Sequence, residues 1–205
     1  MQLIDFEEVI RFHGHSCPGL AFGYRVAGAA LRRLLTDRAI DEDLVAVVEN
    51  SSCAVDAIQA VAGCTFGKGN LIFLDHGKQV YTFFRRLDGE GLRVAVSWKG
   101  PVESEADKAI WQRFFAGDRT PEVNEAVNKL KKEKTEAILR AAEEELLTFS
   151  RPQIEMPAPA RIYDTVICTQ CKEKVMITRT VGKGATAMCI PCAEKAEGRM
   201  INAKL

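Results

Sequence analysis

The sequence has no net charge, no long apolar run and few histidines, and each scarcity limits the possible functions. Lys plus Arg and Asp plus Glu both number 28, which argues against a whole-protein basic field that binds phosphates. No run of about 18 apolar residues is present, so no membrane span is expected. The acidic N-terminus lacks the basic and apolar regions of a signal peptide. A cytoplasmic location is therefore the default expectation.

The totals describe an ordinary packed protein with an unusual supply of thiols. The chain has 205 residues, of which 47% are hydrophobic and 27% charged, as expected for one domain or one domain plus a small module. Its seven cysteines are expected to be reduced in a cytoplasm. Metal binding or catalysis then explains them better than disulfides do.

Two of the three histidines lie within five residues of one cysteine, in the segment His13-Gly-His15-Ser-Cys17-Pro18. Pro18 suits the first turn of a helix, so Cys17 is expected at the N-cap, where the helix dipole stabilises a thiolate. On an extended segment, His13 and His15 would point to the same side as Cys17. We expect a functional site; a capped helix with two surface histidines is the alternative.

A second thiol, Cys53, opens the next predicted helix. His15, Cys17 and Cys53 would make a three-ligand site for zinc or another divalent metal with one open position, the arrangement of catalytic zinc. Asp56, one turn along that helix, can orient a histidine or accept a proton, and His13 is the other candidate for moving a proton. The catalytic candidates are therefore Cys17, His15, Asp56 and His13.

The glycine-containing loop 63–70 follows that helix. It resembles a phosphate-binding loop but has the wrong spacing and no Ser or Thr after its lysine. Lys68 can meet an anion and Gln59 can donate to a substrate oxygen, so both are candidates for ligand binding. Cys64 is either a buried thiol or a member of the site, and His76 is expected to be a turn residue.

Near the C-terminus, two Cys-x-x-Cys pairs are typical of a closed structural zinc site. A module of about 40 residues builds little core, so the metal is expected to supply its fold. Iron in a rubredoxin-like site or a redox pair are the alternatives. The module's mild basic bias is compatible with nucleic acid, but with few aromatics we favour protein contact or dimer bridging. The predicted ligands are Cys168, Cys171, Cys189 and Cys192.

The predicted fold class is α+β, a helix-strand-helix-three-strand layer with a long helical connection and a small C-terminal domain of zinc-ribbon or treble-clef type. Helices are expected at 18–35, 53–62, 103–115 and 121–149, strands at 44–49, 71–74, 79–86 and 92–97, and a hairpin arm at 175–181 turning at 182–184. The domains are 1–150, a proline-containing linker 151–161 and a zinc domain 162–205.

Three blocks of the sequence resemble the E-subunit family of formylmethanofuran dehydrogenase. They are Phe12-His-Gly-His-Ser-Cys-Pro-Gly-Leu-Ala21, Cys53-Ala-Val-Asp-Ala-Ile-Gln59 and Gly63-Cys-Thr-Phe-Gly-Lys-Gly-Asn70. The four-cysteine module resembles the zinc domain that many members carry. The resemblance implies an α+β domain, a long helical connection, a homodimer and a metal-associated pocket. It implies a pocket lined by Cys17, His15, Cys53, Asp56 and His13.

The resemblance suggests an accessory role in one-carbon metabolism, as a possible component of a molybdenum or tungsten formylmethanofuran dehydrogenase or as a zinc-dependent enzyme. The expected partners are a second copy of the chain, a small-molecule ligand and a larger oxidoreductase complex. A metal- or redox-sensing regulator and a metal-delivery protein are the alternatives. Nothing in the sequence resembles a molybdopterin site or an iron–sulfur relay.

Overall fold

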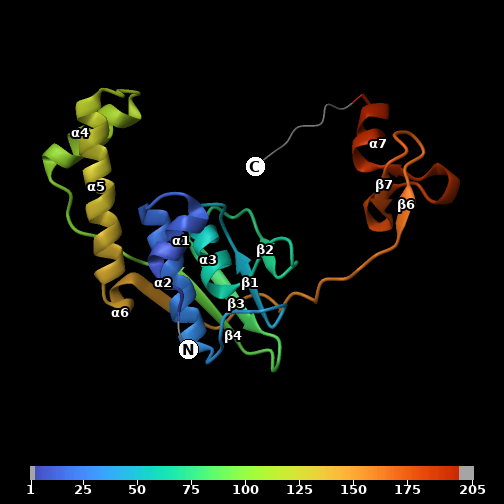
Figure 1. The fold of residues 1–205 in the computed structure, drawn as a ribbon, viewed down its shortest axis with the longest axis horizontal. Helices are drawn as coiled ribbons and strands as arrows, with labels where there is room; N and C mark the ends of the chain where they lie inside the picture. Colours follow the sequence, from blue (N-terminus) through green and yellow to red (C-terminus); the bar gives the residue numbers. More distant parts are fainter. Residues whose placement is uncertain (1–2, 199–205) are drawn as a thin grey trace. The chain divides into compact units, whose positions relative to one another are not determined.

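The computed structural model describes residues 3–198 and divides the chain into two compact units, 1–160 and 161–205. The mixed helices and strands of Figure 1 confirm the predicted α+β class. Residues 199–205, the end of the predicted zinc domain, lie outside the described residues. Within the described range, no helix has the length and apolar character needed to cross a membrane.

The first unit is built on one sheet of five strands in the order β2-β1-β3-β4-β5. β1 and β2 are parallel, and every other neighbouring pair is antiparallel. The strands are β1 (Leu44–Val48), β2 (Leu71–Phe73), β3 (Val80–Arg85), β4 (Gly91–Val96) and β5 (Leu147–Ser150). The first four fall where the sequence predicts strands.

Most of the core lies on one face of this sheet. Leu44, Ala46 and Val48 point from β1 into the main cluster, while Val45 and Val47 belong to a smaller cluster on the opposite face. This alternation is the period of a strand, and it places the helices on the larger apolar face. The helices of the unit are α1 (Phe6–His13), α2 (Pro18–Arg33), α3 (Ala54–Ala62), α4 (Glu105–Phe115), α5 (Pro121–Arg140) and α6 (Glu143–Leu146).

The predicted helix 121–149 is wrong in its last part. α5 ends at Arg140, and Leu147–Ser150 instead forms β5, which pairs with β4. The guanidinium of Arg25, on α2, donates to the carbonyl oxygens of Ile138, Leu139 and Ala141 at 2.7–2.8 Å. Because these carbonyl groups are satisfied by a residue from a distant part of the chain, local periodicity does not mark the end of α5.

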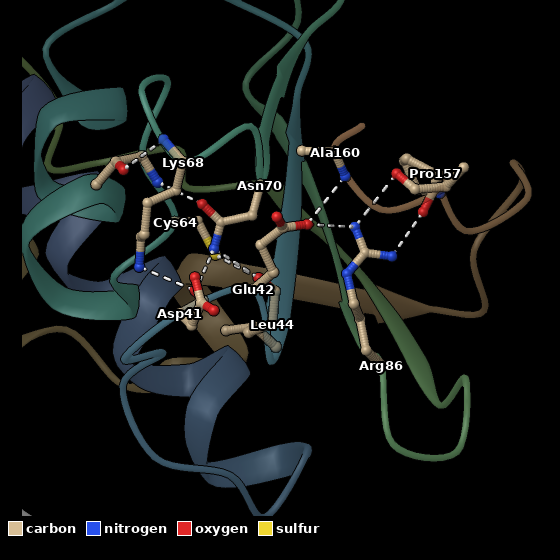
Figure 2. Close-up of polar contacts among 11 residues, drawn as sticks. Asp41, Glu42, Leu44, Cys64, Lys68, Asn70, Arg86, Pro157 and Ala160 are labelled. Atoms are coloured by element: carbon tan, nitrogen blue, oxygen red, sulfur yellow. Dashed lines mark hydrogen bonds and ion pairs between the residues drawn. The ribbon is translucent and has the colours of Figure 1, made fainter. Parts of the chain in front are cut away.

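Part of the predicted linker 151–161 is bound to the first unit (Figure 2). Arg86 donates to the carbonyl oxygen of Pro157 at 2.8 Å and to that of Ala158 at 3.4 Å. The backbone N–H of Ala160 donates to Glu42 at 3.0 Å. Residues 157–160 therefore follow a defined path rather than that of a free spacer.

The second unit consists of short elements around its cysteines. Its strands and helix are β6 (Thr165–Ile167), β7 (Lys174–Met176), β8 (Thr180–Val181), β9 (Met188–Cys189) and α7 (Ile190–Ala196). β6 pairs with β7, and β8 pairs with β9. The predicted arm 175–181 is interrupted by a 3-10 turn, Ile177–Arg179, so its two ends belong to different hairpins.

Candidate metal centre

The N-cap of α2 places the first thiol. Cys17 has extended backbone angles, and its Sγ accepts the backbone N–H of Leu20 at 3.4 Å. Pro18 occupies the first turn, where its missing N–H has no cost. The side chain of Cys17 is 8% exposed, so the sulfur lies at the edge of the core in the field of the helix N-terminus, as expected from the sequence.

Two glycines of α2 let the second thiol approach the first. A Cβ at Gly23 would lie 2.1 Å from the carbonyl oxygen of Ala54, and one at Gly19 would lie 3.1 Å from the Cβ of Cys53. Any side chain at Gly23 would push α3 away from α2. The close crossing brings Cys53, the residue before α3, beside Cys17.

The histidines enter the site in a way that the sequence does not predict. The expected extended segment from His13 to Cys17 is wrong at its start, because His13 is the last residue of α1. Gly14 then takes the left-handed conformation (φ 99°) and ends the helix. This turn brings the two imidazoles together, with 4.4 Å between the ring centroids of His13 and His15.

A carboxylate on α3 fixes the orientation of His13. Nδ1 of His13 lies 2.6 Å from Oδ2 of Asp56, and the other ring nitrogen, Nε2, lies 3.9 Å from Sγ of Cys17. The amide of Gln59 donates to the second oxygen of Asp56 at 3.3 Å. Asp56 therefore holds a ring whose free nitrogen faces the sulfur, an arrangement common around metal-binding histidines.

Together these elements form the histidine–cysteine group: His13, His15, Cys17 and Cys53. Their four ligand atoms lie within 4.8 Å of one another. Two imidazole nitrogens and two sulfurs form a donor set typical of tetrahedral zinc. Burial, followed by the neighbouring Cys17, raises the pKa of Cys53, because a second anion in a partly dry site is unfavourable until a cation joins it.

Exposure separates the members of the group. His15 is exposed, whereas His13 and Cys53 are half-buried and Cys17 is buried. The exposed imidazole is the one that can leave a metal at least cost in packing. The sequence analysis named His13 only as a proton carrier, and the turn at Gly14 is what makes it a candidate ligand.

Three other predicted candidates lie outside the group. Lys68 donates from Nζ to the carbonyl oxygens of Ala39, Ile40 and Asp41 at 2.9–3.4 Å (Figure 2). Cys64 is fully buried, and burial raises the pKa of its thiol to about 12. His76 pairs with Glu49 at 2.9 Å.

A second set of donors, the four-cysteine group, lies in the C-terminal unit: Cys168, Cys171, Cys189 and Cys192. Its four sulfurs lie within 4.8 Å of one another. Hydrogen bonds from the backbone at Cys189 and Cys171 lower the pKa of Cys168 to about 6, whereas a side-chain contact with Cys189 raises the pKa of Cys192. One thiolate is therefore stabilised by the backbone, and further thiolates need a cation among them, which suits a closed tetrahedral metal site.

Comparison with known proteins agrees with this architecture. The sequence model of the family described as "FmdE, Molybdenum formylmethanofuran dehydrogenase operon" matches residues 12–148. A crystal structure of an FmdE-like protein of the tungsten formylmethanofuran dehydrogenase, from Syntrophus aciditrophicus, has a TM-score of 0.59 at 22% identity, over 96% of this chain and 98% of that one. At that identity the likeness shows the fold.

A curated relative from Archaeoglobus fulgidus is described as a probable S-adenosyl-L-methionine-binding protein. It is 31% identical over 190 residues, which cover 89% of this chain. The chain spans about half the length of that relative, 50% of it.

Proposed function

The chain belongs to the FmdE family, and from this premise we propose that it binds zinc at the histidine–cysteine group and serves one-carbon metabolism as an accessory protein of a formylmethanofuran dehydrogenase-type complex. The observation that carries the proposal is the Asp56–His13–Cys17 arrangement. It aims one imidazole nitrogen at a sulfur that already lies beside a second thiol and a second imidazole.

The residues divide into two roles in this proposal. His13, Cys17 and Cys53 would hold the metal from three buried or half-buried positions, with Asp56 keeping the proton of His13 on Nδ1. His15, the exposed member, would either complete the tetrahedron or give up its place to a small carbonyl ligand and carry a proton. A bound zinc ion would supply Lewis-acid polarisation of such a carbonyl or lower the pKa of a bound water.

The four-cysteine group would hold a second zinc with a structural role. Four sulfur ligands leave no position for a substrate. We further propose that the protein acts as a homodimer, as the family resemblance implies, and that its C-terminal unit serves protein contact.

Metal stoichiometry in single-cysteine variants tests this assignment. We expect two zinc ions per wild-type chain by plasma mass spectrometry, and one in Cys17→Ser, with the remaining ion bound by the four-cysteine group. Cys64→Ala is the matched control, because its thiol is buried away from both groups and the variant should keep both ions. Unchanged stoichiometry in a folded Cys17→Ser protein would refute the proposed centre.

A second candidate function is binding of S-adenosyl-L-methionine, which the description of the Archaeoglobus relative favours. Because this chain corresponds to half of that relative, binding by this half is itself the question. Calorimetric titration of the full chain with the compound answers it, and the absence of heat at millimolar ligand would remove this candidate.

A further inference from the structure

A cleft of about 910 Å³ lies between the end of β4 and the helical pair α4–α5, and it contains no member of the histidine–cysteine group. A smaller hollow of about 400 Å³ shares Trp111, Lys108 and Lys134 with it. Volumes of this size are typical of sites for small organic ligands. We call the larger space the tryptophan cleft, because both tryptophans of the chain, Trp98 and Trp111, line it.

Each indole is held by aromatic neighbours. Trp98 meets the ring of Phe22 edge to face, with centroids 5.7 Å apart. Trp111 stacks on Phe115 at 5.7 Å with an interplanar angle of 19°. Both indoles are half-buried. The cleft therefore offers preformed aromatic surfaces whose rotamer freedom is already reduced, which favours stacking of a flat ring.

The charges that line the cleft fall into two classes. Lys108 pairs with Glu105 at 2.7 Å, Asp107 is held by the capping box with Ser104, and Glu133 lies 4.0 Å from Lys129. Those groups are partly neutralised by their neighbours.

Three other lining groups are available to a ligand. Within the described residues, Lys99, Lys134 and Glu103 line the cleft, and none of their side chains has a hydrogen-bond or ion-pair partner. Two free ammonium groups match an anion, and one free carboxylate matches a donor such as a ring amine or a sugar hydroxyl. The combination suits a ligand that carries a flat ring, an anionic group and hydrogen-bond donors.

From these observations we propose that the tryptophan cleft binds a purine mononucleotide, with the base on the indoles and the phosphate on Lys99 and Lys134. Base–aromatic stacking tolerates any flat base, and the two fused rings of a purine cover the most indole surface. The lysines select for the phosphate.

The cleft also approaches the metal centre through one chain of contacts. Its wall includes Gln79, whose amide donates to Ser52 at 3.4 Å. Ser52 directly precedes Cys53, so the proposed ligand would lie near the segment that supplies a metal ligand.

The tryptophans make the site its own reporter. We expect AMP to quench the fluorescence of the full chain saturably, with excitation at the red edge of tryptophan absorption, where AMP does not absorb. Adenosine supplies the ring without the anion and should bind about tenfold more weakly or worse. The variants Trp98→Phe and Trp111→Phe each leave one indole, and both should still respond.

Charge reversal on α5 tests the anion contact. Lys134→Glu should weaken AMP binding about tenfold or more. Lys132→Glu is the matched control, since Lys132 is exposed on the same helix and does not line the cleft, and it should bind as the wild type does.

Three outcomes would overturn the proposal. The first is no saturable response to AMP at millimolar concentration. The second is an equal loss of affinity in Lys134→Glu and Lys132→Glu, which would indicate a general charge effect. The third is a response to oligoadenylate without one to AMP, which would make the cleft a nucleic-acid surface. Zinc stoichiometry is a separate measurement, so this proposal can fail while the metal assignment stands.

Discussion

Nδ1 of His13 and Oδ2 of Asp56 lie 2.6 Å apart, although 43 positions separate the two residues in the chain. One closes α1, and the other lies in the first turn of α3. Their contact joins two helices and sets the direction of the free imidazole nitrogen at once. A substitution at Asp56 therefore tests the metal centre without removing any ligand atom.

We expect Asp56→Asn to weaken metal binding at the histidine–cysteine group by about 10- to 100-fold. The amide cannot hold the His13 ring by the same charged contact, so the ligand is less well oriented and less basic. Competition with a chromophoric zinc chelator measures the change. Glu49→Gln is the control, because Glu49 pairs with His76 at a similar distance, 2.9 Å, outside the group. A similar loss in both variants would contradict the role of Asp56.

Gly23→Ala should destabilise the first unit by about 1–3 kcal/mol or more, since an added Cβ would lie 2.1 Å from the carbonyl oxygen of Ala54. The same displacement of α3 should lower metal occupancy at Cys53. Denaturant unfolding and metal analysis measure the two effects. Gly67→Ala is the control, because nothing lies within 4 Å of its added Cβ. A Gly23→Ala protein of wild-type stability would show that α2 and α3 tolerate separation.

Arg25→Met should cost about 2–3 kcal/mol, because it leaves three carbonyl oxygens at the end of α5 without their charged donor. Hydrogen exchange should show faster opening in the last turn of α5. Arg140→Met is the control: this exposed arginine pairs with Glu136, one turn away on the same helix, and its loss should cost less than about 1 kcal/mol. Equal effects would show that Arg25 does not stabilise the helix end.

Glu143→Gln should lower stability at neutral pH by about 1 kcal/mol, and the difference should vanish in acid. Burial raises the pKa of Glu143, but hydrogen bonds from Arg32 and Arg33 outweigh it and leave the pKa below its ordinary 4.5. A lowered pKa means that the native state favours the carboxylate. The contribution is therefore complete above the ordinary pKa and disappears as the pH falls through the native pKa.

Urea unfolding at a series of pH values measures this effect. Glu144→Gln is the control, since the neighbouring Glu144 is exposed and no ion-pair partner for it occurs among the described residues. A difference between wild type and Glu143→Gln that persists unchanged in strong acid would contradict the ion-pair explanation.

Local sequence chemistry was enough for several elements of this fold. Pro18 with a capping cysteine predicted the start of α2, and alternating apolar residues predicted β1, β3 and β4. The same reasoning failed at 141–150, where Leu146 and Leu147 fit both a helical stripe and a strand. Pairing with β4 and the contact from Arg25 decide between them, and both come from distant parts of the chain.

Two further features of the site required tertiary information. The sequence placed His13, His15 and Cys17 together by proximity, but it did not show that Gly14 reverses the chain after α1. It also gave no indication of the tryptophan cleft. Trp98 and Trp111 lie on different elements, and only the return of α4 and α5 beside the end of β4 gives them one cleft.

The sequence by itself determined the donors: two imidazoles, two helix-capping thiols and two Cys-x-x-Cys pairs, because side-chain chemistry and short spacing are local properties. Only the tertiary structure decided which donors meet. The crossing of α2 and α3 over Gly19 and Gly23 brings Cys53 to Cys17, and the Asp56 contact turns His13 toward both. These are contacts between segments tens of residues apart, which form only when the apolar face of the sheet is covered.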